Sequence, residues 1–538
     1  MFFTLVKPPR ELAQVVDVDV DRLYFRRTLF YSFLIASFLF LVLAAIRFLT
    51  VEADESWILL SIGHLIGGPF AGMGVLSGPV VTSGGLYAVM HYPLMLAGTS
   101  VEIHRMVSFV FAGLTILAVY LIIRAQGART WVALFGVVAF LTVPGLLLQA
   151  GMATAEMMAT FLVIVGAWYW TDRGSLTLAG SVRSGLLFGL ACATRTSAFI
   201  VVPAIIAWGA LYHRSFRHLM TNTLIACGVA CVVFILGTAT LYALFRAGNE
   251  ANFGDVATFF GKTTGLTAKR GLTSCMAYFF ASNNLVPTFT IAVPAIALAL
   301  GLPAGSFAKA RPLCALLVLI GLIGWMGWIL RAPFPHVRYL YPALPALWLA
   351  ATILLLEWLT ELDRGRPRLL LEAGVIAAFA AQFVISLREV YYGDTLAVVY
   401  EAVGVAPIRG AAHGKRVPPF EARRDQNKIG SVLSGLDGNK RICALMKELS
   451  YPLTILTGVK IKSLLDQSGY TQTSKCDYLI VFPAEKNIWI PSRRAIEWII
   501  NNTKLYAQVG DYSLYEIAPG EPVRQLAPDG LIGDLDWP

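Results

Sequence analysis

The stretch that decides the fold is LFYSFLIASFLFLVLAAIRFLTVEADESW, residues 29–57. Its first part, 29–49, is long and apolar enough to cross a bilayer as a helix. Three carboxylates, Glu52, Asp54 and Glu55, follow where the chain has just left the hydrocarbon. We therefore expect a membrane protein that places paired acids at the lipid boundary.

The composition of the whole chain is that of an integral membrane protein. Of its 538 residues, 57% are hydrophobic and only 14% are charged. A soluble protein of this size has no way to bury so much apolar side chain, because the outside of its core must be polar. The chain is therefore expected to cross the membrane many times.

Apolar runs of near-spanning length recur along the chain and predict about eleven transmembrane helices. They lie at residues 29–49, 105–123, 131–149, 153–170, 182–194, 196–212, 222–245, 285–302, 313–330, 339–359 and 369–387. Arg195 interrupts the pair between 182 and 212. The polar segment before the first run lacks a cleavage site, so this run is expected to act as a signal anchor.

Basic residues in alternate loops predict the orientation, because cytoplasmic loops carry an excess of Lys and Arg. If the N-terminus is cytoplasmic, the inward loops contain Arg124, Arg129, Arg173, Arg183, Arg214, Arg217, Lys309, Arg311, Arg364, Arg366 and Arg368. The net charge of +10 follows from this pattern. No basic patch with interleaved aromatic residues is present, which argues against nucleic-acid binding.

Three segments are then expected on the outer face. They are a first outer loop at 50–104, a second at 246–284, and the tail. The tail contains short apolar bursts such as CDYLIVF (476–482) and YSLYEI (512–517), and the helix-like SRRAIEWIINN (492–502). These patterns predict a small α/β domain.

The expected organisation therefore has three parts. Residues 1–390 form the transmembrane module, 391–440 a linker rich in Gly, Arg and Lys, and 441–538 an extracytoplasmic α/β domain. Of the seven cysteines, Cys443 and Cys476 lie in this polar tail. They are expected either to pair in an oxidising compartment or to stay as two buried thiols.

The first outer loop continues beyond the acids with SWILLSIGHLI (56–66), whose apolar residues recur at the spacing of an interfacial helix. A connector rich in Gly and Pro follows at 67–85, where the chain can bend and approach a ligand closely. HYPLML (91–96) comes next. By themselves, the acids fit a solvated helix end as well as they fit a functional site.

Three further motifs lie outside this loop. EIHRMVSF (102–109) places Arg105 at the opening of the second span, and GLLFGLACATRTSAFI (185–200) contains Arg195. HVRYLYPALPALWL (336–349) contains His336 and Arg338.

Taken in this order, the motifs resemble those of the GT-C glycosyltransferases, and above all the protein mannosyltransferase and aminoarabinose transferase group. Asp54, Glu55 and Trp57 match an acidic DExW signature after the first helix, and the resemblance covers roughly residues 28–390. His91 and Arg195 stand where that group usually has Lys. These two substitutions indicate a distinct subfamily and leave the sugar open.

The resemblance implies a polytopic enzyme that moves a monosaccharide from undecaprenyl or dolichyl phosphate to a lipid, glycan or protein acceptor outside the cytoplasm. It implies inverting single displacement and, for a bacterial chain, a multi-pass protein of the inner membrane. The expected fold class is an all-α polytopic membrane protein of GT-C type with a small C-terminal α/β extracytoplasmic domain.

The chemistry of such a transfer needs a base for the acceptor hydroxyl, and Asp54 is the candidate because an aspartate is ionised at neutral pH. Glu55 is expected to orient the acceptor or a cation, or to hold the loop. Whether the two acids share a divalent cation stays open, since no complete ligand set is visible.

Negative charge grows on the departing phosphate, so cations are expected opposite it. The outward candidates are Arg338, His336, Arg105, His91, Lys262, Lys269, Arg270 and Arg195. Arg338 is favoured, because a guanidinium binds phosphate bidentately and this residue stands at a helix start. Glu156, just inside the outer end of the fourth span, is the candidate for the acceptor pocket.

Two other function classes fit a polytopic chain. A transporter or flippase of lipid-linked sugars predicts charges at mid-membrane depth and internal repeats. The sequence contains no visible repeat, and its charges gather near the outer ends of the spans. An oligosaccharide ligase or polymerase uses the same kind of donor with basic residues in large outer loops.

Overall fold

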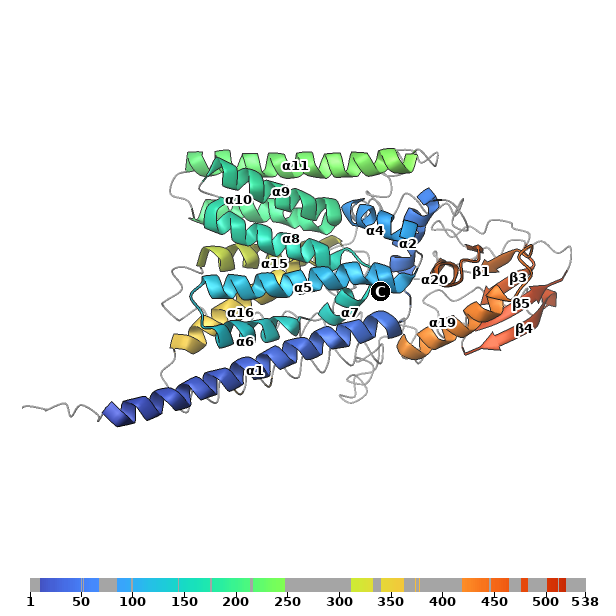
Figure 1. The fold of residues 1–538 in the computed structure, drawn as a ribbon. Coiled ribbons are helices and arrows are strands. Elements are labelled where there is room, and N and C mark those ends of the chain that lie inside the picture. The colour runs from blue at the N-terminus through green and yellow to red at the C-terminus, as the bar shows by residue number, and fades with distance from the viewer. Residues whose placement is uncertain are drawn as a thin grey trace, which may run out of the picture.

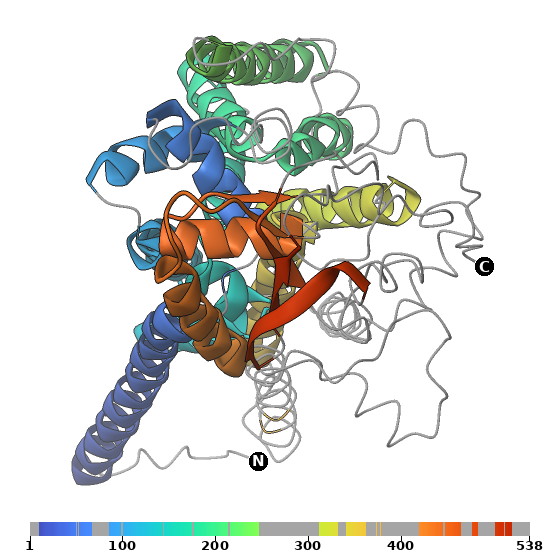
Figure 2. The ribbon, with the colours of Figure 1, turned by 90° about the vertical axis from the view of Figure 1, so that its right-hand side faces the viewer.

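The protein, described here from a computed structural model, consists of a bundle of apolar helices and an α/β domain at one end of it (Figure 1). The structure describes residues 10–49, 51, 53–66, 85–97, 100–143, 145–174, 177–212, 216–246, 311–331, 340–361, 373, 377, 419–444, 447–463, 476–481, 501–510 and 512–518. Figure 2 looks from the side of the α/β domain, which lies in front of the helices.

The helices of the bundle follow the apolar runs of the sequence. They are α1 (Arg10–Phe48), α2 (Ala53–Ile66), α4 (Gly85–Ala97), α5 (Val101–Ala125), α6 (Thr130–Leu141), α7 (Leu146–Gly151), α8 (Glu156–Tyr169), α9 (Leu178–Thr194), α10 (Val201–Tyr212), α11 (Phe216–Arg246), α15 (Arg311–Arg331) and α16 (Ala343–Glu361), with short turns η2 (Trp170–Gly174) and η3 (Thr196–Ile200). Every predicted span within the described residues coincides with such a helix or helix pair. The spans predicted at 285–302 and 369–387 lie outside the described residues, apart from 373 and 377.

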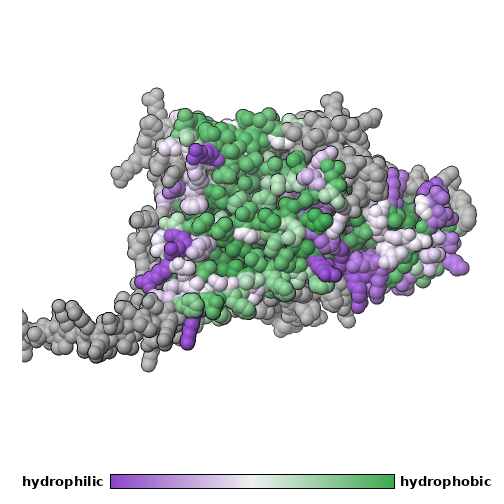
Figure 3. Space-filling view, in the orientation of Figure 1, coloured by the Kyte–Doolittle hydropathy of each residue, from purple (hydrophilic) through white to green (hydrophobic). Residues whose placement is uncertain are grey.

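Three of the described helices are long and apolar enough to cross a membrane by themselves: Tyr24–Phe48, Val101–Ala125 and Met220–Gly237. Many of their large apolar side chains remain exposed in the folded chain, as expected of a surface that faces lipid. On α1, α5 and α11 these include Phe30, Phe33, Phe40, Val110, Leu117, Leu121, Val232, Ile235 and Leu236. Figure 3 shows the resulting hydrophobic band across the helices, with hydrophilic residues at its ends and over the α/β domain. The protein is an integral membrane protein.

One local prediction needs correction. The run 131–149 is not one helix, since α6 and α7 are separate: Pro144 offers no N–H to a helix, and Gly145 caps α7 with a φ of 72°. Residues 58–62 of α2 do form a helix, but Ile58, Leu60 and Ile62 are buried in the main apolar core. The helix contacts α4 and α20, and its predicted position at the membrane interface stays a prediction.

The α/β domain contains α19 (Pro419–Ser434), β1 (Ile442–Ala444), α20 (Lys447–Thr457), β2 (Ile461–Ser463), β3 (Tyr478–Val481), β4 (Thr503–Val509) and β5 (Tyr512–Ile517). The sheet is mixed and has the order β2-β1-β3-β5-β4. β1 runs parallel to β2 and β3, whereas β5 runs antiparallel to β3 and β4. The predicted bursts at 476–482 and 512–517 form β3 and β5.

Part of the predicted linker is helical, because α19 occupies 419–434. Its apolar residues Ile429, Val432 and Leu433 pack on the core of the α/β domain, where the first and last are fully buried. This helical spacing was hidden among charged residues, which is why the segment resembled a linker. Most of 492–502 and all of 391–418 lie outside the described residues.

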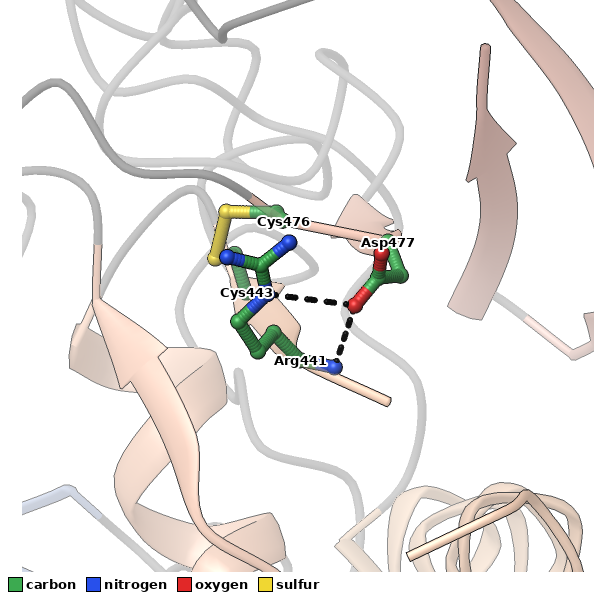
Figure 4. Close-up of a disulfide and its surroundings, with 4 residues drawn as sticks. All are labelled: Arg441, Cys443, Cys476 and Asp477. Carbon is green, nitrogen blue, oxygen red and sulfur yellow. Dashed lines mark hydrogen bonds and ion pairs between the residues drawn. A yellow bond between two sulfur atoms is a disulfide. The ribbon is translucent and has the colours of Figure 1, made fainter. Parts of the chain in front are cut away.

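A disulfide joins Cys443 and Cys476, with 5.9 Å between their Cα atoms (Figure 4). Beside it, the Asp477 carboxylate accepts hydrogen bonds from the backbone N–H and the Nε of Arg441, at 2.7 and 3.3 Å. These bonds hold the pKa of Asp477 below its ordinary value, the backbone N–H contributing most. Of the two alternatives open for these cysteines, the structure has the disulfide.

Helices α9 and α11 approach closely through small residues. A Cβ added at Gly185 would lie 2.5 Å from the backbone oxygen of Ala226, and one at Gly189 would lie 2.9 Å from the Cα of Ala230. The spacing of four residues on both helices is the pattern by which membrane helices pack backbone to backbone.

We predict that Gly185→Ala destabilises the protein by about 1–3 kcal/mol, the usual cost of overpacking. The added methyl would meet backbone, which has little freedom to move away. The matched control is Gly228→Ala on α11, where an added Cβ meets nothing within 4 Å. The measurement is the unfolding midpoint in detergent, and equal midpoints for the two variants would contradict the close contact.

Candidate functional site

Buried polar side chains gather where the helical bundle meets the α/β domain. They come from α2 and α4, from the beginning of α5, and from α7 through to the first residue of α8, all of which lie at that end of the bundle (Figure 1). The fully or nearly fully buried members are Glu55, Tyr87, His91, His104, Arg105, Ser108, Gln149, Thr154 and Glu156. A polar layer of this size in an apolar protein needs internal hydrogen bonds, because each unpaired group costs free energy.

The centre of this layer is an ion pair between Glu55 and Arg105, both fully buried. The Arg105 Nε donates to Glu55 Oε2 at 3.0 Å, and its Nη2 donates to Oε1, so the contact is bidentate. Arg105 Nη1 also donates to the carbonyl oxygens of Ile46 and Leu49, at 2.8 and 3.1 Å. These carbonyls end α1, where no further helical N–H is available to them.

Glu55 connects this pair to a third segment. Its Oε2 accepts a hydrogen bond of 3.1 Å from the backbone N–H of Ala153, between α7 and α8. One carboxylate and one guanidinium thus join the exit of α1, the first turn of α2, the second turn of α5 and the approach to α8. Of the roles predicted for Glu55, this geometry fits the one that holds the loop.

The predicted role of Arg105 opposite a phosphate stays a prediction, and in the structure its guanidinium is engaged within the protein. All three guanidinium nitrogens of Arg105 donate to Glu55 or to the end of α1, and its side chain is not exposed at all. α5 begins at Val101, one turn before the expected start of the span, so Arg105 lies within the helix and not at its opening.

Asp54, the predicted base, lies in the first turn of α2, directly before Glu55. Its side chain falls outside the part of the chain whose side chains are described. The backbone of Asp54 is nevertheless fixed next to the buried pair, since Glu55 is tied to two other segments.

A second group consists of Tyr87, His91 and His104. The Nδ1 atoms of His91 and His104 lie 3.0 Å apart, so one ring donates and the other accepts. The Tyr87 ring contacts His91 edge-on, at 4.4 Å between ring centroids. The Tyr87 hydroxyl also lies 3.0 Å from Ser108 Oγ, which donates to the carbonyl of Thr154.

Burial, and to a smaller extent the neighbouring His104, lower the pKa of His91 to about 3. His91 is therefore neutral at physiological pH and does not supply the positive charge predicted from its position in place of a Lys. Burial raises the pKa of Tyr87 well above its ordinary value, and the carboxylates of Glu156 and Glu55 add to this rise. Tyr87 thus lies within electrostatic reach of both acids.

A third group is the ion pair between Glu156 and Arg195, 2.8 Å apart. Glu156 is the first residue of α8, and Arg195 stands in the extended break between α9 and η3. Among the described residues, Glu156 Oε2 has no hydrogen-bond partner although the side chain is almost completely buried. The predicted role of Glu156 in an acceptor pocket stays a prediction.

Sequence reasoning missed two residues of the α/β domain, Arg423 and Gln426. The Gln426 side chain exchanges two hydrogen bonds of 3.0 Å with the backbone N–H and carbonyl of Val51. Arg423 Nη2 donates to Glu102 Oε1 at 2.7 Å. The available signal was their spacing of three residues, which places them on one face of a helix.

The remaining predicted cations lie outside the described residues: Lys262, Lys269, Arg270, His336 and Arg338. Their roles stay predictions. Within the described part of the chain, no group of three or more His, Cys, Asp or Glu side chains is arranged to hold a metal ion.

No protein-family model matches the chain, and no curated protein matches it in sequence. Solved structures do match. ArnT from Cupriavidus metallidurans bound to undecaprenyl phosphate is similar with a TM-score of 0.56 and 13% sequence identity, over 93% of this chain and 99% of ArnT. The apo state of ArnT gives 0.56 and 12%, over 90% of this chain and 97% of ArnT.

AglB, the oligosaccharyltransferase of Archaeoglobus fulgidus, is similar with a TM-score of 0.46, 11% identity and coverage of 91% of this chain and 75% of AglB. That TM-score is too low to support a common fold. The ArnT match is higher and extends over nearly the whole of both chains. The protein therefore has the fold of ArnT, in agreement with the fold that the resemblance of its sequence motifs implied.

We predict that Arg105→Gln destabilises the protein by about 3–5 kcal/mol, because it leaves the Glu55 carboxylate buried without its counter-charge. Adding Glu55→Gln is expected to recover part of the loss. The measurement is a double-mutant cycle on unfolding free energy in detergent. Strictly additive losses would contradict a coupled pair.

Proposed function

We propose that this protein is a membrane glycosyltransferase that transfers a monosaccharide from a polyprenyl-phosphate carrier to an acceptor on the extracytoplasmic side. The observation that carries the proposal is the structural similarity to ArnT. The matched region covers 99% of ArnT and therefore includes its C-terminal part as well as its membrane part. The ArnT structure holds undecaprenyl phosphate, which supports a polyprenyl phosphate as the carrier here.

The site supports this function through its position. The buried polar layer lies at the end of the apolar bundle, next to a polar domain, where the headgroup of a membrane-embedded carrier meets a water-soluble acceptor group. Asp54 is proposed as the base that removes the acceptor proton while the hydroxyl attacks the anomeric carbon. The sugar–phosphate bond then breaks on the opposite side, the configuration inverts, and polyprenyl phosphate leaves.

The described residues give the other acids distinct parts in this proposal. Glu55 positions Asp54 through its pair with Arg105 and its bond to Ala153. Glu156, with one unpartnered oxygen, accepts a hydrogen bond from the acceptor. Phosphate binding falls to Arg338, His336, Lys262, Lys269 and Arg270, which lie outside the described residues.

Sidedness is supported by the disulfide between Cys443 and Cys476, because disulfides persist in oxidising compartments and are rare in the cytosol. An extracytoplasmic α/β domain places the polar layer on the same face, since the two are in contact. This agrees with the orientation predicted from the basic loops, with the N-terminus in the cytoplasm.

A transporter of lipid-linked sugars receives less support. Its charges would lie at mid-membrane depth. In the described part of the bundle, the buried ion pairs lie at helix ends: Glu55 and Arg105 near the beginnings of α2 and α5, Glu156 at the first residue of α8, and Arg195 just after α9.

We predict that the purified protein releases polyprenyl phosphate from one member of a panel of polyprenyl-phosphate sugars. Asp54→Asn is expected to slow this release at least about 100-fold, the usual contribution of a general base. Product formation is measured by mass spectrometry, with wild type and variant at equal, folded concentrations. Equal rates would remove Asp54 from the mechanism, and no release from any donor would refute the proposed function.

A second experiment tests the orientation. Single cysteines replace exposed residues at the two ends, Lys460→Cys in the α/β domain and Ala125→Cys at the end of α5. In intact cells, a membrane-impermeant maleimide is expected to label position 460 and to label position 125 only after permeabilisation. The unsubstituted chain, with its own cysteines, gives the background. The reverse labelling would contradict an extracytoplasmic α/β domain.

A further inference from the structure

The α/β domain is held against the first outer loop by one face of α19. The Gln426 side chain makes two hydrogen bonds with the backbone of Val51. Val51 lies three residues before Asp54 in the sequence. Arg423, one turn earlier on the same face, pairs with Glu102 at the start of α5. Ile455 of α20 is buried in the same apolar cluster as the bundle helices. The contact between the α/β domain and the bundle therefore contains both hydrogen bonds and buried apolar side chains. It fixes Arg423 beside the polar layer.

Arg423 is unusual within this interface because its charge is buried and only partly engaged. Its side chain is 9% exposed, and Nη2 is bonded to Glu102. Among the described residues, its Nε and Nη1 atoms have no hydrogen-bond partner. A buried guanidinium donor without an acceptor is costly, since burial removes its water. An anion at this place would satisfy these donors.

The charges around Arg423 show how close it lies to the candidate site. Burial lowers the pKa of the Arg423 guanidinium; Glu102 raises it, Arg105 lowers it and Glu55 raises it. Arg423 therefore lies close enough to Glu55 and Arg105 to interact with their charges. Arg105 is neutralised by Glu55, whereas Glu102 is 38% exposed and shares its charge with a 2.6 Å hydrogen bond from Ser100.

We propose that Arg423 binds a phosphate group at the boundary between the bundle and the α/β domain, so that the α/β domain supplies a residue of the substrate site. The unpartnered donors Nε and Nη1 lie on different edges of the planar guanidinium, so each can donate a separate charge-assisted hydrogen bond to a phosphate oxygen. Glu102 orients the guanidinium and is the group with which the phosphate competes. The identity of the phosphate as that of a lipid carrier rests on the proposed function.

The test measures binding without turnover, using the purified full-length protein in nanodiscs and three probes: undecaprenyl phosphate, undecaprenol and inorganic phosphate. Arg423→Gln is expected to weaken binding of the phosphate-bearing probe at least tenfold and to leave undecaprenol unaffected. Arg424→Gln is the matched control, because it removes the same charge at the next residue, whose side chain is 58% exposed. A loss confined to undecaprenyl phosphate assigns the site to the carrier, and a loss for inorganic phosphate assigns it to a soluble group.

Glu102→Gln separates phosphate binding from a purely structural ion pair. If Arg423 serves only to hold the domains together, this variant weakens binding as Arg423→Gln does. If Arg423 binds phosphate, Glu102→Gln keeps or tightens binding, because the competing carboxylate is gone. Arg423→Lys, which keeps the charge but lacks the separate Nε and Nη1 donors, is expected to fall between wild type and Arg423→Gln.

The proposal is overturned if Arg423→Gln binds undecaprenyl phosphate and inorganic phosphate as wild type does, or if Glu102→Gln and Arg423→Gln weaken binding equally. It is also overturned if the wild type binds undecaprenyl phosphate no better than undecaprenol and does not bind inorganic phosphate. These results are independent of sugar transfer. A chain that binds phosphate through Arg423 but transfers no sugar from any donor would refute the proposed function alone.

Discussion

The buried ion pair between Glu55 and Arg105 is the constraint on which the arrangement of this site depends. A carboxylate and a guanidinium inside an apolar bundle are stable only when each has its partner and its remaining hydrogen bonds. Glu55 obtains them from Arg105 and Ala153, and Arg105 from Glu55 and the end of α1. Because Arg105 binds both the end of α1 and Glu55 of α2, it fixes the position of α2 relative to α1. The backbone of Asp54, next to Glu55, is fixed with it.

The α/β domain belongs to this arrangement and is more than an appended module. Gln426 binds the backbone of Val51, which lies between α1 and α2. The segment that carries the acids is thus held by Arg105 of α5, which binds Glu55, and by Gln426 of α19, which binds Val51. A site between two parts of a chain can contain residues from both. In the proposal made above, Arg423 is the residue that the α/β domain contributes.

The fold could be predicted from sequence to a large extent, because spanning helices must satisfy their own backbone hydrogen bonds in lipid and therefore appear as long apolar runs. The same reasoning failed where a run contained a break, as at Pro144 and Gly145, and where helical spacing was diluted by charges, as in α19. The motifs placed Glu55, His91, Arg105, Glu156 and Arg195 in one region, and the structure does bring them to the same end of the bundle. Two of these residues have surroundings that differ from those expected. Burial keeps His91 neutral, and all three guanidinium nitrogens of Arg105 already donate hydrogen bonds within the protein.

The sequence by itself determined that this chain is a membrane protein of apolar helices, that its acids follow the first helix, and that its tail is an α/β domain. Only the tertiary structure decided which charges pair. Glu55 meets a residue 50 positions away, and Val51 meets one 375 positions away. The reason is physical: apolar periodicity fixes how each helix sits in lipid or in the core, whereas ion pairs form between side chains that the packing of different helices brings together.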